Sequence, residues 1–364
     1  MLNQLKLTNY RGFKQYSVND LARVNLFVGK NGSGKTSILE AVQILIARGD
    51  IGFLNAITRR RAETPSDSSS DDMSDVSIIY RPNVRHFFYK RQIVPRAFFE
   101  ISADNFETVR AEIDEPTTSD TEALSDITEL PENRVIRVLR ILEGRFLVED
   151  DGTLLITDRK FFPNLLKLNP QEHRRTPTRF ITSDSLRVQA MSSMWNEMVF
   201  DSMESEVIDV MRILDDSIED IFFLKEDKAH RSETTILVSY KGGRGRVPLG
   251  STGEGMRRLL AIALALVESK GGILLIDEID TGLHYSVLGD MWRLIARAAK
   301  TSDIQVFATT HSLDCVRGLA WLCENYPDLA GDVALHKIDS SLERSIVLDG
   351  NQIVIASEQE IEVR

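Results

Sequence analysis

A glycine-rich loop near the start of the chain constrains its fold more than any other feature. Residues 29–36 (GKNGSGKT) have the pattern G-x-x-x-x-G-K-T, between the apolar run 24–28 (VNLFV) and a stretch whose apolar residues recur at helical spacing up to Gly49. Glycines let the backbone N–H groups turn toward a phosphate, and the start of the helix adds positive potential. A turn without a ligand is the alternative, which this context disfavours. The predicted phosphate-binding residues are Gly29, Asn31, Gly32, Ser33, Gly34, Lys35, Thr36 and Ser37.

A second motif supplies carboxylates. Residues 272–278 (GILLIDE) are an apolar run that ends in Asp277 and Glu278. We expect the Thr36 hydroxyl and Asp277 to hold Mg²⁺, and Lys35 to serve both binding and catalysis as the counter-charge of the β- and γ-phosphates. Glu278 is then placed to orient and polarise an attacking water. A simple strand-end cap is the alternative. Together with the phosphate loop, the pair predicts Mg²⁺-dependent ATP hydrolysis.

Two further motifs indicate the class of ATPase. Residues 250–255 (GSTGEG) precede an apolar helical stretch, and the free N–H groups there, with the hydroxyl of Ser251, predict an anion site for a γ-phosphate. Residues 309–312 (TTHS) end another apolar run, where His311 is placed to hydrogen-bond a γ-phosphate. A ligand-free helix cap and a structural histidine are the respective alternatives.

The order of strand-like and helix-like segments predicts an α/β fold. Helical spacing at 254–269 and 285–300 alternates with apolar runs at 273–276 and 305–310, which is typical of a mainly parallel core sheet. Residues 192–224 have a helical pattern and are followed by a predicted hairpin at 234–249. The two final runs, SIVLDG and NQIVIAS, resemble strands.

Residues 50–175 differ from the rest. They contain short strand-like runs and two acidic segments, 66–75 with four Asp and 111–133 with eight carboxylates, neither with a basic residue. Setting those twelve aside leaves 43 acidic against 44 basic residues, so the net charge of −11 belongs to these segments. We therefore predict a β-rich insertion with two mobile acidic loops that are dispensable for ATP hydrolysis. Residues 81–99 interleave basic and aromatic side chains, which fits either an edge strand or a nucleic-acid surface.

These motifs, in this order, resemble ABC-type ATPases of the RecF/SMC/OLD group. The opening NYRGF at 9–13 is similar to an N-terminal motif of that group, in which the position of Arg11 approaches the bound nucleotide. STGEG resembles the signature motif with Ser251 and Gly253, LLIDEID the Walker B motif with Asp280 as its D-loop residue, and TTHS the switch histidine. Such proteins form homodimers or higher oligomers that enclose ATP and Mg²⁺ in composite sites.

The chain looks most similar to short OLD-like ATPases. We expect this sequence not to include the Toprim nuclease domain that OLD proteins carry. In the resembled group, proteins without that domain often control a separate effector protein, commonly in anti-phage defence. The resemblance covers about 1–50 and 175–364, which we predict to be the ATPase domain. Thr252 stands where many relatives have Gly, and Gln92 is the candidate for the Q-loop.

Alternatives remain open at this point. A RecF-like head would bind DNA directly, and the balanced charge outside the acidic segments neither indicates nor excludes nucleic acid. The D-loop sequence DTGLH and the NYRGF opening argue against a transporter subunit. No apolar run has the length of a membrane span, and no secretory signal is apparent, so we expect no membrane association and a cytoplasmic location. Cys315 and Cys323, eight residues apart on a predicted helix, are too distant for a disulfide.

Overall fold

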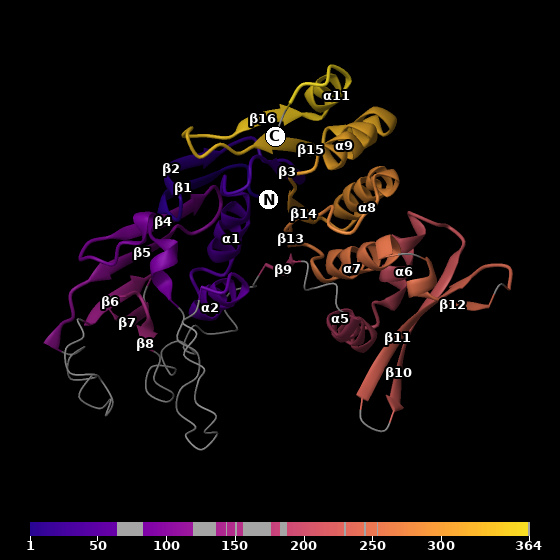
Figure 1. Cartoon of the computed structure of the whole chain (residues 1–364), viewed down its shortest axis with the longest axis horizontal. Coiled ribbons are helices and arrows are strands. Elements are labelled where there is room, and N and C mark those ends of the chain that lie inside the picture. Colours follow the sequence, from indigo (N-terminus) through magenta and orange to yellow (C-terminus); the bar gives the residue numbers. More distant parts are fainter. Residues whose placement is uncertain are drawn as a thin grey trace.

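The computed structural model has three parts, seen from left to right in Figure 1: an antiparallel β lobe, a central parallel sheet with its helices, and a lobe of helices and a long hairpin. The residues that the structure describes are 1–63, 83–118, 136–142, 144–149, 151–155, 176–182, 188–228, 231–243, 245–252 and 254–362.

The central sheet has six strands in the order β16-β15-β3-β14-β13-β9. All neighbours run parallel except β16, which pairs antiparallel to β15 at the edge. This is the mainly parallel core sheet that the alternating pattern predicted. The strands are β3 (Val24–Val28), β9 (Thr178–Ile181), β13 (Ile273–Ile276), β14 (Gln305–Thr309), β15 (Val333–Lys337) and β16 (Ile346–Asp349).

Both faces of this sheet are buried. Successive side chains along each strand point to opposite faces, and each face packs in a different apolar cluster. On one face, Phe27, Leu275 and Phe307 pack with helix α1 (Lys35–Ile46). On the other face, Leu26, Leu274 and Val306 pack in a cluster with residues of the C-terminal helices. Those helices are α7 (Glu254–Glu268), α8 (Leu288–Thr301), α9 (Leu313–Asn325) and α11 (Gly350–Glu358), with the short η5 (Tyr285–Val287) and α10 (Pro327–Ala330) between them.

The antiparallel lobe is one seven-stranded sheet in the order β2-β1-β4-β5-β6-β7-β8. Its apolar face covers the other side of α1, so this helix lies between the two sheets (Figure 1). Strands predicted for a separate insertion therefore extend the sheet that the N-terminal strands begin. The bounds are β1 (Leu5–Tyr10), β2 (Phe13–Val18), β4 (Phe98–Ala103), β5 (Val109–Asp114), β6 (Ile136–Ile141), β7 (Gly144–Glu149) and β8 (Leu154–Leu155), with α2 (Ile51–Arg60) beside them.

The third part surrounds its own apolar cluster. Trp195 and Met211, from two helices, pack there with Leu260 of α7 and with Ile221 and Ile236 of a long hairpin. The elements are α5 (Val188–Phe200), α6 (Glu204–Arg212), β10 (Ile218–Lys228), β11 (Arg231–Tyr240), β12 (Arg246–Pro248) and η4 (Leu249–Thr252).

One helix prediction and one strand prediction were wrong in the C-terminal half of the chain. The end of the helix predicted over 192–224 is strand β10, because residues from Ile218 onward pair along their whole length with β11. The last run, NQIVIAS, forms helix α11 instead of a strand. Asp349 and Gln352 make a reciprocal capping box at its start, which supplies the backbone N–H groups with partners.

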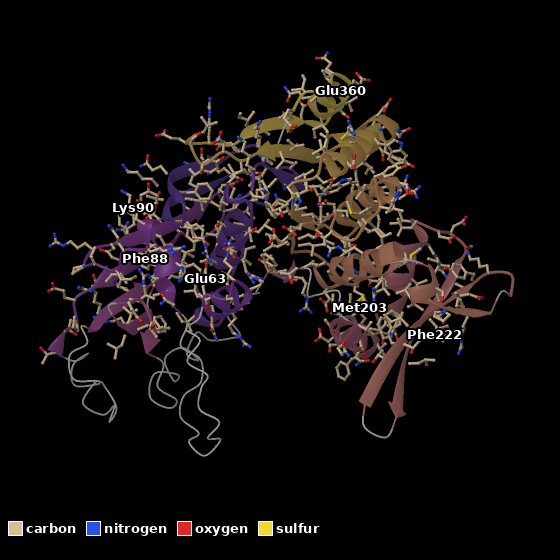
Figure 2. All side chains as sticks on the ribbon, in the orientation of Figure 1. Glu63, Phe88, Lys90, Met203, Phe222 and Glu360 are labelled. Atoms are coloured by element: carbon tan, nitrogen blue, oxygen red, sulfur yellow. The ribbon has the colours of Figure 1, made fainter. Side chains whose placement is uncertain are left out.

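Two predictions in the β lobe also need correction. Residues 84–91 form the short 3-10 helices η1 (Val84–Phe87) and η2 (Tyr89–Arg91) instead of an edge strand, with Phe88 buried and Lys90 at the surface (Figure 2). The acidic loop expected at 111–133 begins later, because β5 extends to Asp114. Its alternation buries Ile113 and leaves Glu112 and Asp114 to pair with Arg140. The segment 66–75 and residues 119–133 lie outside the described residues.

The described part of the chain bears on two expectations, the lack of a membrane-spanning helix and the lack of a disulfide between the two cysteines. Its helices include none with the length and apolar character of a membrane span. Cys315 and Cys323 are both free thiols in buried positions on α9, as their separation predicted.

Candidate active site

The phosphate loop has the backbone that its sequence predicts. Gly29, Gly32 and Gly34 adopt positive φ angles of 149°, 77° and 102°, a region that glycine enters at little cost. At Gly34 a Cβ atom would lie 2.3 Å from Cζ of Phe13, so both conformation and space require glycine. The loop leads directly into α1, whose first N–H groups are the ones that phosphate oxygens satisfy in loops of this kind.

Lys35 lies over this loop. Its Nζ donates hydrogen bonds to the carbonyl oxygens of Gly29 at 2.7 Å and Lys30 at 3.1 Å. Burial lowers the pKa of Lys35, while the carboxylates of Asp277 and Glu278 act in the opposite direction. The ammonium group is therefore held at the phosphate loop with two carboxylates near enough to influence its charge.

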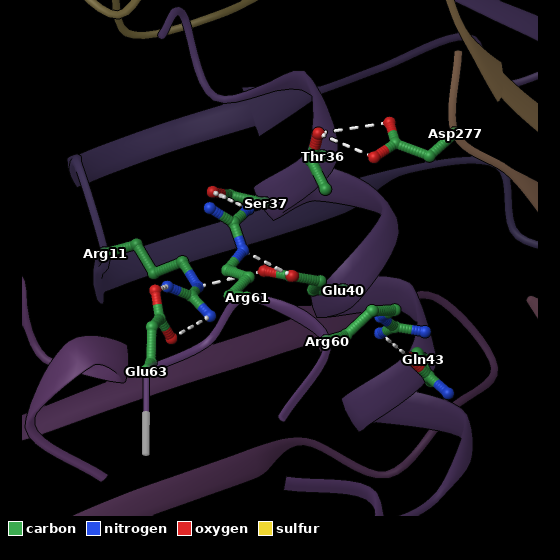
Figure 3. A network of polar contacts seen from close by, with 9 residues as sticks. All are labelled: Arg11, Thr36, Ser37, Glu40, Gln43, Arg60, Arg61, Glu63 and Asp277. Carbon is green, nitrogen blue, oxygen red and sulfur yellow. Dashed lines mark hydrogen bonds and ion pairs between the residues drawn. The ribbon is translucent and has the colours of Figure 1, made fainter. Parts of the chain in front are cut away.

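The loop meets the second motif through a pair of side chains. Thr36 Oγ1 lies 3.1 Å from both Oδ1 and Oδ2 of Asp277 (Figure 3). A threonine hydroxyl and a carboxylate are hard oxygen donors, the kind that Mg²⁺ prefers, and Mg²⁺ completes its shell with waters and phosphate oxygens. The described residues contain no group of three or more His, Cys, Asp or Glu that would hold an ion alone. The two donors of Thr36 and Asp277 fit Mg²⁺ that would take its other ligands from water and phosphate oxygens.

The sheet order brings the remaining predicted residues to this corner. Because β3, β14 and β13 are parallel neighbours, their carboxyl ends share one edge of the sheet. Glu278 and Asp280 follow β13, and His311 follows β14 just before α9. Glu278 and His311 are exposed, and Asp280 Oδ1 accepts a hydrogen bond of 2.5 Å from Thr310 Oγ1. The structure therefore places Glu278, Asp280 and His311 at the same edge of the sheet as the phosphate loop.

Arg11 lies in a network of ion pairs behind the phosphate loop. Its guanidinium pairs with Glu40 at 3.0 Å and with Glu63 at 2.9 Å, and its side chain is only 8% exposed. Arg61 pairs with the same Glu40 at 2.6 Å and reaches Ser37 Oγ at 3.3 Å (Figure 3). The network therefore connects Arg11 with the end of the phosphate loop through Glu40 and Arg61.

The signature motif belongs to another part of the molecule. Ser251 is exposed on η4, and its neighbour Leu249 packs in the apolar cluster of the third lobe. Gly253 lies outside the described residues. Gln92, the candidate for the Q-loop, is exposed at the end of η2 in the antiparallel lobe.

Residues 24–314 match the protein family described as "AAA domain, putative AbiEii toxin, Type IV TA system". This range includes the phosphate loop, the carboxylate pair, the signature motif and His311. The chain belongs to this family. The phosphate loop and the mainly parallel sheet of this AAA-domain protein are those of a P-loop ATPase.

Known proteins agree with this placement. The chain is 21% identical over 345 residues to an ATP/GTP phosphatase of Helicobacter pylori, covering 87% of this chain and 86% of the relative. A 44-residue stretch, 12% of each chain, is 46% identical to the DNA replication and repair protein RecF of Clostridioides difficile. An SMC head solved with the C-winged helix domain of ScpA has the same fold at 14% identity and a TM-score of 0.51, over 96% of this chain and 98% of that one.

The structure of this AAA-domain protein adds functional candidates that sequence reasoning missed. Thr309 Oγ1 donates to Asp277 Oδ1 at 2.6 Å and accepts from the backbone N–H of Glu278 at 2.9 Å. The end of β9 also lies at this corner, since the N–H of Asp277 donates to the carbonyl of Ile181 at 3.0 Å. The TTHS motif contained the signal for Thr309. Nothing in the sequence around Ile181 marked that strand as the neighbour of Asp277.

Proposed function

We propose that two copies of this chain close around two ATP molecules and that closure controls a separate effector protein. The observation that carries the proposal is the contact between Thr36 and Asp277, 3.1 Å apart, beside an exposed Glu278. It joins the phosphate loop to the residues that hydrolysis needs. Each chain thus has the phosphate-loop half of a site, while its Ser251 lies on another lobe.

The residues of the corner have separate roles in this proposal. Lys35 binds the β- and γ-phosphates, with the backbone N–H groups of the loop and with Ser37. Thr36 and Asp277 hold Mg²⁺, which neutralises charge on the phosphates. Glu278 orients the attacking water and accepts its proton. His311 hydrogen-bonds the γ-phosphate, and Arg11 and Asp280 support the nucleotide side and the dimer side of the same corner.

The signature residues act on the nucleotide of the second chain. Ser251 and Gly253 precede α7, where free N–H groups at a helix start favour an anion. Hydrolysis therefore needs a pair of chains, and the paired and separated states give the molecule its two forms. A reversible, ATP-dependent dimer is a suitable switch for a partner that binds only one form.

The effector belongs to the same proposal. As in the OLD-like resemblance, we place the nuclease or other effector activity on a separate protein, acting in the cytoplasm in defence against phage. The RecF match covers only 12% of this chain, so direct DNA binding is the second candidate. Salt-dependent binding of duplex DNA in the presence of ATP, absent without ATP, would favour that second candidate over an effector protein.

The proposed nucleotide site is tested by Lys35→Ala. Removing the counter-charge of the phosphates is expected to weaken ATP binding by about 100-fold or more, measured by equilibrium titration. Lys30→Ala is the matched control, since Lys30 is an exposed lysine of the same loop and contributes only its carbonyl to the contact with Lys35. If Lys35→Ala binds ATP as tightly as Lys30→Ala does, the site assignment is wrong.

A further inference from the structure

A buried arginine connects the signature helix with the turn that carries Glu278. Arg258, in the second turn of α7, is 2% exposed, and its Nη2 donates to the carbonyl oxygen of Glu278 at 2.9 Å. A second contact reaches the carbonyl of Ile279 at 3.4 Å. The guanidinium of one helix therefore lies against the backbone of the Walker B turn.

The turn that Arg258 contacts has an unusual backbone. Glu278 has a φ of +49°, a left-handed conformation that costs free energy for a residue with a side chain. Its N–H donates to Thr309 Oγ1, and its carbonyl also accepts the N–H of Thr281 at 3.0 Å. These contacts hold both the N–H and the carbonyl group of Glu278, so they restrict the backbone from which its side chain extends. Arg258 is the charged member of this set.

Arg258 has more hydrogen-bonding capacity than these contacts use. Its Nε and Nη1 atoms are buried without a partner among the described residues. Unpaired buried donors are costly, which makes them uncommon where packing alone is at stake. Burial lowers the pKa of Arg258, and the nearby carboxylates of Asp280 and Glu278 oppose that effect. The guanidinium thus lies within electrostatic reach of the two acidic side chains, Asp280 and Glu278, that follow β13.

The start of the same helix lies beside the segment that follows Asp280. A Cβ atom at Gly255 would lie 3.5 Å from Cδ2 of Leu283, an ordinary van der Waals separation. Ser251 of η4 lies three residues before Glu254, where α7 begins. We expect a shift of Ser251 toward a phosphate on a second chain to move α7, and with it Arg258, relative to Glu278.

We propose that Arg258 is a positioning residue that holds the Glu278 turn and transmits the position of the signature helix to it. This inference rests on the proposed role of Glu278 in hydrolysis. It implies that Arg258 contributes to the rate of the chemical step while leaving ATP binding to the phosphate loop. The unpaired Nε and Nη1 atoms leave the guanidinium three N–H groups that can donate to other acceptors when α7 moves.

The experiment compares Arg258→Met, Arg258→Lys and the control Arg257→Met in the full chain. Arg257 is the adjacent arginine of the same helix and is only partly buried. Loss of a hydrogen bond from a charged donor is expected to lower kcat of Arg258→Met about 10- to 100-fold, with the KM and Kd for ATP within about threefold of wild type. Arg258→Lys keeps the charge and one donor and is expected to recover part of kcat. Arg257→Met is expected to retain the wild-type kcat.

Each result decides the proposal. An unchanged kcat in folded Arg258→Met overturns it, and so does a loss of ATP affinity that equals the loss of kcat, since that indicates a general structural role. If Arg258→Met does not fold, Arg258→Lys decides alone: reduced kcat at unchanged KM supports the proposal, and wild-type kcat overturns it. Glu278→Gln separates the two levels. Wild-type turnover in Glu278→Gln would refute the role of Glu278, whereas inactive Glu278→Gln with fully active Arg258→Met refutes only the role of Arg258.

Discussion

The phosphate-loop corner and the signature loop are both built around helix starts, but they differ in what surrounds them. At the corner, Lys35, Thr36 and Asp277 already contact one another or the loop backbone at 2.7 to 3.1 Å. Around Ser251 the structure shows an exposed residue on a short 3-10 helix. One region is organised by its own chain, and the other presents its donor group outward.

Their supporting cores differ as well. Helix α1, behind the phosphate loop, is enclosed between two sheets, so Ile38, Val42 and Leu45 are almost completely buried. The signature loop rests on the third lobe, where Leu249 packs with the helices and the long hairpin. The difference teaches that the residues proposed for phosphate and metal lie at the centre of the chain, whereas the residue proposed for the signature contact lies on a separate lobe. Such an arrangement is suited to a site completed by a second copy.

The largest effect on the corner is expected from Glu278→Gln. Glutamine keeps the size of the side chain but cannot accept a proton from water, so kcat is expected to fall about 10²- to 10⁴-fold with ATP binding retained. The measurement is phosphate release at saturating ATP, with Kd determined on the same preparation. Thr281→Val measures how much of this effect depends on the neighbouring hydroxyl, because Thr281 Oγ1 donates a hydrogen bond of 3.4 Å to Glu278 Oε2. Equal turnover in Glu278→Gln and wild type would remove Glu278 from the mechanism.

A smaller effect is expected from Thr309→Val. Valine has the shape of threonine, but it loses the 2.6 Å hydrogen bond to Asp277 and leaves the N–H of Glu278 without its partner. Loss of this charge-assisted contact should lower kcat about tenfold and raise the Mg²⁺ concentration needed for half-maximal activity. Thr309→Ser retains the hydroxyl and should restore both values. Identical Mg²⁺ titrations of the valine variant and wild type would show that Thr309 does not organise the metal corner.

The smallest effect concerns the sheet beneath the corner. His336 of β15 is fully buried, its Nε2 lies 3.2 Å from Oδ1 of Asn25 on β3, and burial lowers its pKa to about 3. Between about pH 6.5 and 3 the unfolded chain binds the proton that folded His336 excludes, so folding stability decreases as the pH falls below about 6.5. The loss from this one group is at most about 1.4 kcal/mol per pH unit.

His336→Gln tests this prediction, since glutamine keeps a donor for Asn25 and does not titrate. Denaturant unfolding at pH 7.5, 6.5 and 5.5 should show a weaker decrease of stability in the variant than in wild type. The phosphate-loop corner should bind ATP equally in both proteins at pH 7.5. Equal pH slopes would mean that His336 does not exclude a proton in the folded state.

Sequence alone predicted what depends on short-range pattern. The glycines of the phosphate loop, the strand before it and the carboxylates after β13 carry their chemistry in adjacent residues, and the parallel sheet brought them together as expected. Patterns that need a partner far along the chain were misread. Residues from Ile218 onward have helical spacing, but pairing with β11 decides their structure. Conversely, the capping box of Asp349 and Gln352 was a local helix signal that the strand-like run concealed.

The site shows the same division. Asp277, Glu278, Asp280 and His311 were predicted from their motifs, whereas Thr309 became a candidate only through the adjacency of β13 and β14. The family resemblance assigned Arg11 to the bound nucleotide. The structure shows that Arg11 forms ion pairs with Glu40 and Glu63, which come from two other segments of the chain. Arg258 was inconspicuous in an apolar helix until the fold placed its guanidinium under Glu278.

The most direct test of the comparison is to mix two inactive variants. Lys35→Ala removes the phosphate-loop half of the site, and Ser251→Arg fills the signature half with a bulky charge. A mixed dimer has one site in which both halves are intact. After subunit exchange, demonstrated with two different tags, the mixture should regain ATPase activity up to about a quarter of the wild-type value, because half of the dimers are mixed and each has one intact site. A mixture that exchanges subunits and still hydrolyses no ATP would contradict a site shared between two chains.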